Sequence, residues 1–283
     1  MKTLYKRLLT FFIGFPIVLG LVFIQVCHHL PMHFLLLFFS VVGTLEFCKM
    51  AKNKQTIFPT WLIMAEVLVL WFACMMFCMF QSKYEFINFE YLLWIYAVEV
   101  IIFYAVESIS AKTFEVSLSK MSISSMIVFY MGFLPTFIQR ISTLPNESLL
   151  LILYFIFVFM CDSSAWFFGI LFGKSTRGVF AASPNKSIVG FIGGIFGATT
   201  LGVIFTLFFP EAFNFPVWKT IIAGVLTSTA AIIGDLVESV FKRSCGVKDS
   251  GWIIPGRGGS MDCLDSLILG APVFYACAAI LFN

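Results

Sequence analysis

Long apolar runs separated by short polar segments dominate this chain. A helix needs about 20 apolar residues to cross the hydrocarbon core of a bilayer, and most of the runs approach that length. The pattern predicts nine membrane-spanning helices, at about 8–27, 30–48, 57–80, 91–107, 121–139, 148–172, 188–209, 217–237 and 265–282. The predicted fold class is therefore all-α, a polytopic integral membrane protein. We divide it into N-terminal helices, residues 1–147, and a C-terminal membrane region, residues 148–283, in which the candidate catalytic residues described below lie.

Composition supports this interpretation. The 283 residues are 60% hydrophobic and 12% charged, whereas a soluble domain carries about 25% charged residues. No soluble core could bury so much apolar surface. The eight cysteines lie mostly inside apolar runs and form no C-x-x-C pair, so we expect free thiols and no zinc site.

The basic residues predict an orientation. With a cytoplasmic N-terminus, nine spans place fifteen of the eighteen Lys and Arg residues on the cytoplasmic side and the C-terminus outside. The first apolar run follows Lys2, Lys6 and Arg7, as in a signal peptide. No small-x-small cleavage site follows that run, so we interpret it as an uncleaved membrane helix.

Three acids interrupt the early spans. Glu46 lies near the cytoplasmic end of its helix and can reach the headgroup layer, whereas Glu66 and Glu99 lie deeper. An acid inside a membrane is costly unless it faces protein or water, so functional and structural roles both stay open for these two. Further along, glycines open the seventh span with G-x-x-x-G spacings, which predict close helix packing. They are Gly190, Gly193, Gly194 and Gly197.

One polar stretch, Gly234–Ser266, stands out from the apolar chain. Its acids are Asp235, Glu238, Asp249, Asp262 and Asp265, and its bases are Lys242, Arg243, Lys248 and Arg257. Carboxylates bind hard divalent cations, while basic side chains and glycine-rich backbone bind phosphate. The stretch therefore predicts a metal–nucleotide site. The alternative is an ordinary charged loop whose acids cap the last helix.

Helical spacing gives this site a geometry. Asp235, Glu238 and Lys242 would share one helix face with Ser239, and Asp262 and Asp265 would share a face at the start of the last helix. We expect Asp235, Asp262 and Asp265 to hold Mg²⁺, with room for a second cation. The four bases would bind phosphate oxygens, and Gly256, Gly258 and Gly259 would let backbone N–H groups approach an anion.

Two upstream segments add candidates. Asp162 lies in the cytoplasmic half of an apolar run and needs a cation or a donor as partner. The loop that follows contains Gly173-Lys174-Ser175 and then Ser183-Pro184-Asn185-Lys186-Ser187. Gly173-Lys174-Ser175 is not a Walker P-loop, because Phe168 stands where the first glycine would be.

The stretch closely resembles the signature of phosphatidate cytidylyltransferases, also called CDP-diacylglycerol synthases. The matching frame is Ser239-x2-Lys242-Arg243-x4-Lys248-Asp249-x-Gly251-x2-Ile254-Pro255-x2-Gly258-Gly259-x2-Asp262-x2-Asp265. Upstream, Gly234-Asp235-Leu236, Ser183–Ser187 and Asp162–Lys174 resemble further motifs of that family. The chain departs from the pattern at Arg257, where the family has His, at Cys263, where it has Arg, and at Val189, where it favours Glu.

The resemblance implies transfer of CMP from CTP to phosphatidate in the bilayer, giving CDP-diacylglycerol and pyrophosphate. It implies catalytic roles for Asp235, Lys242, Arg243, Lys248, Asp262 and Asp265, and substrate-binding roles for Asp162, Ser183, Lys186, Ser239, Asp249, Arg257, Gly258 and Gly259. The compact size of the chain favours a bacterial inner-membrane protein, and the distribution of Lys and Arg predicts a cytoplasmic active site. A homodimer is compatible with the family, and we expect no nucleic-acid partner.

Three other functions stay open. A CTP-dependent lipid kinase, or a cytidylyltransferase for another lipid, would use a similar metal–phosphate site and differ in its product. A transporter would use Glu66, Glu99 and Asp162 as an ion path, but we find no inverted repeat between the halves. An inactive relative would account for Arg257 and Cys263.

Overall fold

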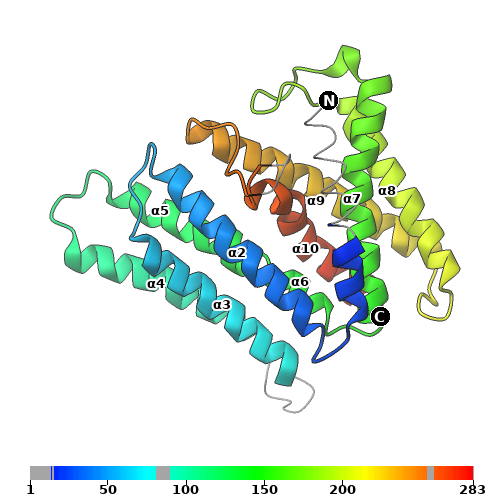
Figure 1. Ribbon diagram of the computed structural model, residues 1–283, viewed down its shortest axis with the longest axis horizontal. Coiled ribbons are helices and arrows are strands. Elements are labelled where there is room, and N and C mark those ends of the chain that lie inside the picture. The colour runs from blue at the N-terminus through cyan, green and yellow to red at the C-terminus, as the bar shows by residue number, and fades with distance from the viewer. Residues whose placement is uncertain (1–13, 15, 81–89, 254–257, 283) are drawn as a thin grey trace. The chain divides into compact units, whose positions relative to one another are not determined.

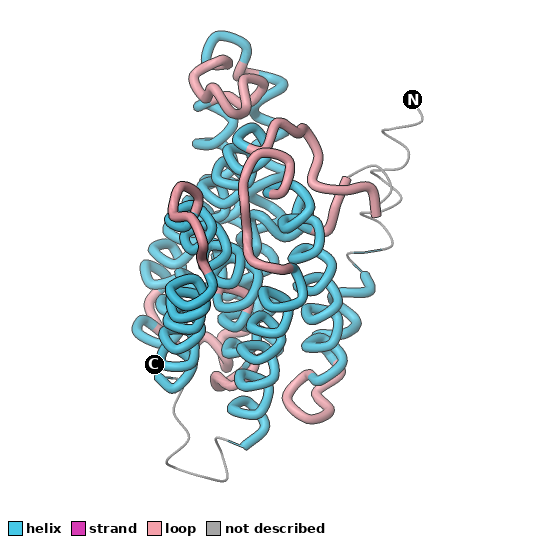
Figure 2. Tube along the Cα trace, turned by 90° about the vertical axis from the view of Figure 1, so that its left-hand side faces the viewer, coloured by secondary structure: helices cyan, strands magenta, loops and turns pink. Residues whose placement is uncertain are grey.

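The computed structural model describes residues 14, 16–80, 90–253 and 258–282. These residues form helices joined by loops, with no strand among them (Figure 2). Eight of the described helical segments are long and apolar enough to cross a membrane. The predicted all-α, polytopic membrane fold is confirmed. The first predicted span, 8–27, lies partly outside the described residues, which include a helix over 16–23.

The chain divides into two compact units. The first unit contains Met1–Thr143 and Lys242–Cys263, and the second contains Leu144–Phe241 and Leu264–Asn283. Helices α9 (Val217–Ser244) and α10 (Met261–Leu281) contribute residues to both. This division differs from the predicted regions mainly in segment 242–263, which packs with N-terminal helices.

The first unit is built on α2 to α6. Their bounds are α2 Leu30–Ala51, α3 Thr60–Phe80, α4 Glu90–Ser110, α5 Ser117–Val128 and α6 Thr136–Ile141. In Figure 1 α2 and α3 run side by side, and α4 lies next to α3. Aromatic side chains fill the core: Phe58 and Phe103 stack with ring centroids 4.8 Å apart, and Trp71 is 2% exposed. Such rings remove large apolar areas from the surroundings and fix the helix packing.

A π-helical turn joins α5 to α6. It covers Phe129–Phe133, and the Leu134 N–H donates to the Phe129 carbonyl at 3.0 Å. Pro135 follows directly and has no N–H with which to continue the α-helical pattern. The predicted span 121–139 is therefore three helical pieces that form one candidate span, Ser117–Ile141.

Buried acids of the first unit face protein. Glu107 accepts hydrogen bonds from the Ser117 hydroxyl at 2.7 Å and the Lys120 ammonium at 2.5 Å. Glu66 and Glu99 are each 4% exposed and line a cavity of about 520 Å³, without a hydrogen-bond partner among the described residues. Both acids of the deeper pair are therefore covered by neighbouring side chains of this unit.

The second unit packs α7 (Glu147–Leu171) and α8 (Ile188–Phe208) along each other (Figure 1). Glycines of α8 make this possible. A Cβ at Gly193 would overlap the Phe168 ring, and one at Gly194 would press on the Cys161 carbonyl oxygen at 2.8 Å. The close packing predicted from the G-x-x-x-G spacings is confirmed.

Helices α9 and α10 are longer than the apolar runs that predict them. α9 continues past residue 237 to Ser244, where Gly246, at φ +75°, terminates it. The Val247 N–H donates to the Lys242 carbonyl at 2.9 Å, and the Gly246 N–H to the Arg243 carbonyl at 3.0 Å. These bonds form the glycine cap that ends many helices. Hydropathy indicates only the part of a helix that suits lipid. The polar end of α9 was predicted instead from the helical spacing of Asp235, Glu238 and Lys242, and the structure shows it as helix.

Candidate active site

A loop of the second unit brings two basic residues together. Arg177 and Ser187 form an antiparallel bridge, and the Gly178 N–H donates to the Pro184 carbonyl at 2.9 Å. The Ser187 hydroxyl accepts the Gly190 N–H at 3.0 Å and caps the start of α8. The segment Ser183–Ser187 is therefore a folded turn at a helix N-terminus. It fixes Lys186 on the same side as Arg177.

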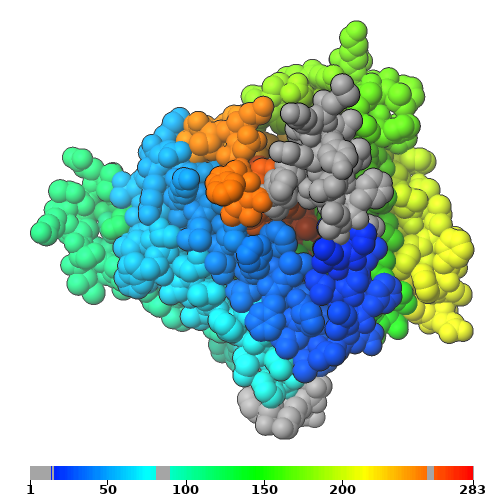
Figure 3. All heavy atoms as spheres, viewed as in Figure 1, coloured from blue at the N-terminus to red at the C-terminus, as the bar shows by residue number. Residues whose placement is uncertain are grey.

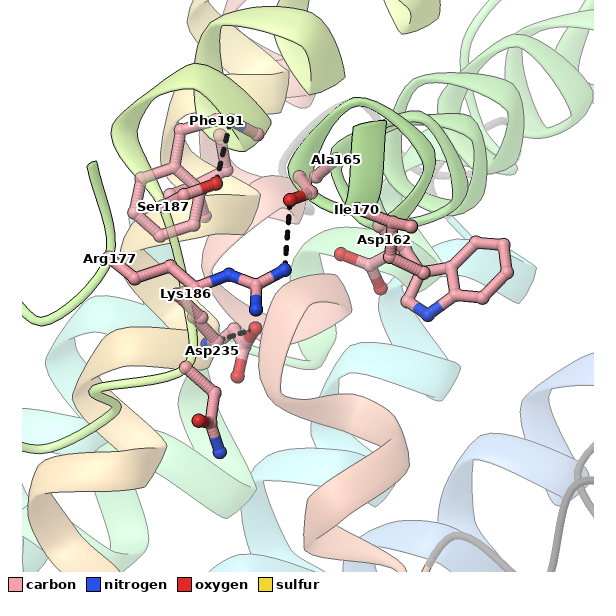
Figure 4. A pocket seen from close by; sticks show the side chains of 13 residues that line it. Asp162, Ala165, Ile170, Arg177, Lys186, Ser187, Phe191 and Asp235 are labelled. Carbon is pink, nitrogen blue, oxygen red and sulfur yellow. Dashed lines mark hydrogen bonds and ion pairs between the residues drawn. The ribbon is translucent and has the colours of Figure 1, made fainter. Parts of the chain in front are cut away.

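This loop closes one side of a cavity of about 260 Å³. Figure 4 shows Arg177, Lys186 and Asp235 on one side, with Asp162 of α7 facing them. Lys186 forms an ion pair with Asp235 of α9. The Arg177 guanidinium donates to the Gly169 carbonyl at 3.0 Å and remains exposed. The cavity thus combines two acids with two bases.

Three carboxylates converge beside the cavity. Asp235, Glu238 and Asp265 each offer an oxygen, and these oxygens lie within 4.8 Å of one another. Glu238 is 0% exposed and Asp265 is 9% exposed. Asp235 and Glu238 lie one turn apart on α9, and Asp265 approaches them from α10. The expected convergence of Asp235 and Asp265 is present, with Glu238 as the third member.

Local contacts hold Asp162, the fourth acid of the site, near these three carboxylates. The Ser266 hydroxyl lies 3.5 Å from an oxygen of Asp162, and the Ser266 N–H donates to the Asp265 carboxylate at 2.7 Å. Ser266 therefore links the carboxylate of α7 to the start of α10.

The donor set fits Mg²⁺. The ion prefers carboxylate oxygens and water, and protein sites supply one or two carboxylates with the rest from substrate phosphate and water. Three buried or half-buried carboxylates repel one another, and the Lys186 ammonium pairs with Asp235. A divalent cation held by Asp235, Glu238 and Asp265 would offset this repulsion.

Asp262 belongs to a different network, in the first unit. Its carboxylate accepts the Lys242 ammonium at 2.5 Å, the Gly259 N–H at 2.7 Å and both donors of Ser250, the hydroxyl at 2.8 Å and the N–H at 3.0 Å. Asp262 was predicted to bind metal and Lys242 to bind phosphate. The structure pairs the two with each other.

The other predicted site residues occupy varied positions. Arg243, Lys248 and Asp249 are exposed, Ser183 is half-buried, and Ser239 is 8% exposed on α9. Gly258 has φ +115°, a conformation that favours glycine. Gly256 and Arg257 lie outside the described residues, and so do Ile254 and Pro255 of the matching frame.

Comparison with known proteins assigns the family. A family model described as "Cytidylyltransferase family" matches residues 5–281, nearly the whole chain. The chain belongs to this family. The match includes the early helices, for which the sequence motifs gave no resemblance beyond hydrophobicity.

Curated relatives of this chain are named phosphatidate cytidylyltransferase. One from Haemophilus influenzae is 40% identical over 154 residues, which is 53% of this chain and 53% of that protein. One from Staphylococcus haemolyticus is 42% identical and one from Staphylococcus aureus 43% identical, each over 129 residues, 45% of this chain and 48% of theirs. The matched segments thus span about half the length of the curated relatives.

Two residues of the site were not predicted to act there. Glu238 was placed on the same helix face as Asp235, and the i, i+3 spacing was the signal that could have added it to the metal ligands. Arg177 was not among the predicted site residues. Its role depends on the turn that pairs it with Ser187, which spacing does not reveal.

Proposed function

We propose that this cytidylyltransferase-family protein transfers CMP from CTP to phosphatidate, giving CDP-diacylglycerol and pyrophosphate. The observation that carries the proposal is the convergence of Asp235, Glu238 and Asp265 beside a cavity that also holds Lys186 and Arg177. Acids for a metal and bases for phosphate are what a nucleotidyl transfer requires. The names of the curated relatives supply the substrates.

The reaction is one substitution at phosphorus. A phosphate oxygen of phosphatidate attacks the α-phosphorus of CTP. The bond between that phosphorus and the oxygen bridging to the β-phosphate breaks, and pyrophosphate leaves. Because the attacking oxygen already carries negative charge, the chain need not supply a strong general base. Its task is to hold two anions together and stabilise the charge that develops.

Named residues divide this task. Asp235, Glu238 and Asp265 would hold Mg²⁺, which supplies positive charge to the triphosphate when bound. Lys186 and Arg177 would bind phosphate oxygens, with the Lys186–Asp235 ion pair fixing the lysine side chain. Phosphate-binding roles for Arg243, Lys248 and Arg257, and a second cation, stay predictions from the sequence.

The surroundings of the cavity suit a lipid substrate. Trp166 and Ile170 line it and are 63% and 52% exposed. Apolar side chains exposed on a membrane helix contact acyl chains, so a phosphatidate could keep its tails in the bilayer while its headgroup enters the cavity. We place the site on the cytoplasmic side of a bacterial inner membrane, where CTP is made and where the basic residues predict it to lie.

A product assay tests the proposal. Purified protein in detergent–lipid micelles receives CTP labelled at the α-phosphate, Mg²⁺ and phosphatidate. We expect label in the lipid phase and release of pyrophosphate, both abolished by EDTA. Labelled CDP in water with an unlabelled phospho-lipid would instead identify a lipid kinase. Absence of turnover by folded protein would contradict catalysis and favour an inactive relative or a transporter.

A further inference from the structure

Glu46, in the N-terminal part of the chain, accepts hydrogen bonds from the signature segment that lies between α9 and α10. It lies on α2, is 7% exposed, and belongs with residues 242–263 to the first unit. One carboxylate oxygen accepts the Ser260 N–H at 3.1 Å. The other accepts the Met261 N–H and the Ser250 hydroxyl, both at 3.1 Å. In Figure 3 the segment after α9 (orange) lies against α2 (blue).

These bonds cap α10 from a distant helix. The first N–H groups of a helix have no partner within it, and a nearby Ser, Thr, Asp or Asn usually accepts them. Here a carboxylate more than 200 positions earlier in the chain accepts the N–H groups of Ser260 and Met261. A negative charge at a helix N-terminus also interacts favourably with the helix dipole.

Two glycines of the signature make room for Glu46. A Cβ on Gly251 or on Gly259 would overlap its carboxylate. Gly251 does not have the left-handed φ that glycine alone adopts readily, so the space for Glu46 is the structural reason for glycine there. Gly259 also donates its N–H to Asp262 at 2.7 Å.

Ser250 connects Glu46 to Asp262. Its hydroxyl oxygen lies 3.1 Å from Glu46 and 2.8 Å from Asp262, and its single proton can be donated to one of them at a time. Its N–H donates to Asp262 at 3.0 Å. The loop end at Ser250 and the helix start at Met261 are thus held by two carboxylates together, one from α2 and one from α10.

We propose that Glu46 is a positioning residue of the active site. It fixes the backbone on both sides of residues 254–257 and thereby presents Asp262 and its partner Lys242 in one arrangement. This role rests on the proposed function, because it matters for catalysis only if these signature residues take part in it. The helices before residue 144 then supply part of the framework that holds Lys242 and Asp262, besides anchoring the chain in lipid.

A glutamine cannot take over this role. Glu46 accepts two backbone N–H groups on different oxygens, and it shares the Ser250 hydroxyl proton with Asp262. Gln has one acceptor oxygen, and its NH₂ group would face an N–H. Glu46→Gln therefore leaves at least one buried donor unsatisfied, whereas Glu46→Asp keeps the charge on a shorter side chain.

Hydrogen exchange of the whole protein in micelles tests the contact without relying on activity. In Glu46→Gln we expect amide exchange in peptides containing Ser260 and Met261 to become about tenfold faster, and in Glu46→Asp less so. Glu107→Gln is the matched control, a buried glutamate of the same unit that contacts Ser117 and Lys120 instead. It should leave those peptides unchanged. Equal exchange in Glu46→Gln and the wild type would overturn the proposal.

A double-mutant cycle covers the case in which Glu46→Gln does not fold. Gly251→Ala should lower the melting temperature by about 5 °C, because its methyl group overlaps the Glu46 carboxylate. In the Glu46→Ala background, Gly251→Ala should lower the melting temperature by less than about 1 °C, because the space that the Glu46 carboxylate occupied is then empty. An equal loss in both backgrounds would show that Gly251 is not there to accommodate Glu46.

Measurements of turnover distinguish a positioning role of Glu46 from a purely structural one. At a temperature where both proteins are folded, Glu46→Gln should lower kcat about tenfold and change KM for CTP by less than about threefold, and Glu46→Asp should restore part of kcat. Unchanged kcat together with faster exchange would refute the catalytic role and leave only a structural one. If the wild type makes no CDP-lipid, the proposed function fails, while exchange and melting still report on the contact.

Discussion

Gly234 of α9 lies against the backbone carbonyl of Asp265 in α10, so closely that a Cβ at position 234 would overlap that oxygen. This approach lets the carboxylates of Asp235 and Glu238 meet that of Asp265. Glycine inside a helix costs about 1 kcal/mol relative to alanine. Gly234 offsets this cost because it allows the close approach of α9 and α10.

Gly234→Ala should therefore impair both stability and activity. Its methyl group forces the helices apart, which we expect to cost about 1–3 kcal/mol in the free energy of unfolding and to lower turnover more than tenfold, since misplacement of about 1 Å at a site has such effects. Thermal melting and the product assay measure the two. Gly20→Ala is the control, because nothing lies within 4 Å of a Cβ there. Equal behaviour of the two variants would disprove the argument.

Glu238→Gln should weaken the affinity of the site for Mg²⁺. The change keeps the size of the side chain and removes one of three charges, so the Mg²⁺ concentration at half-maximal turnover should rise at least about tenfold. Titration of Mg²⁺ in the product assay measures it. Glu115→Gln, an exposed acid of a loop, serves as the control. A Glu238→Gln protein with the wild-type Mg²⁺ profile would remove Glu238 from the metal ligands.

Lys186→Gln should weaken the affinity of the protein for CTP. The variant loses a cation that would bind phosphate oxygens and leaves Asp235 without its ion-pair partner. We expect KM for CTP to rise about tenfold, the equivalent of one charge-assisted hydrogen bond. Lys186→Arg should lie between the variant and the wild type. Lys174→Gln, at an exposed position of the same loop, should change KM little, and an equal effect at both positions would indicate only a general loss of positive charge.

Arg257→His restores the residue that the resembled family carries. If Arg257 substitutes for that residue, turnover should stay within about threefold of the wild type. The product assay on the purified variant measures it. Loss of turnover would mean that Arg257 has a role of its own in this chain.

Hydrophobic runs were enough to predict the fold class, because lipid requires long apolar helices whatever their packing. The same runs did not predict where α9 and α10 end. Ser244 follows a polar helical extension capped by Gly246, and α10 begins at Met261 because Glu46 accepts its first N–H groups. Neither feature leaves a hydropathy signal.

The site was partly predictable for a related reason. Asp235, Lys186 and Asp162 line one cavity, and the sequence motifs had singled out all three. Spacing along one helix also placed Glu238 beside Asp235. The partner of Asp262 and the role of Glu46 were beyond such reasoning, because they depend on contacts between distant segments. Periodicity describes the face of one helix and carries no information on which helix covers it.

Binding of Mn²⁺ tests the central claim most directly, that Asp235, Glu238 and Asp265 hold a divalent cation. Mn²⁺ favours the same oxygen ligands as Mg²⁺ and is detected by its paramagnetic signal. Intact protein in micelles is titrated with Mn²⁺ in the presence of CTP, and Asp265→Asn is compared with the wild type. The account predicts saturable binding by the wild type and at least about tenfold weaker binding by Asp265→Asn, with the same helical content. Equal binding by both folded proteins would contradict it.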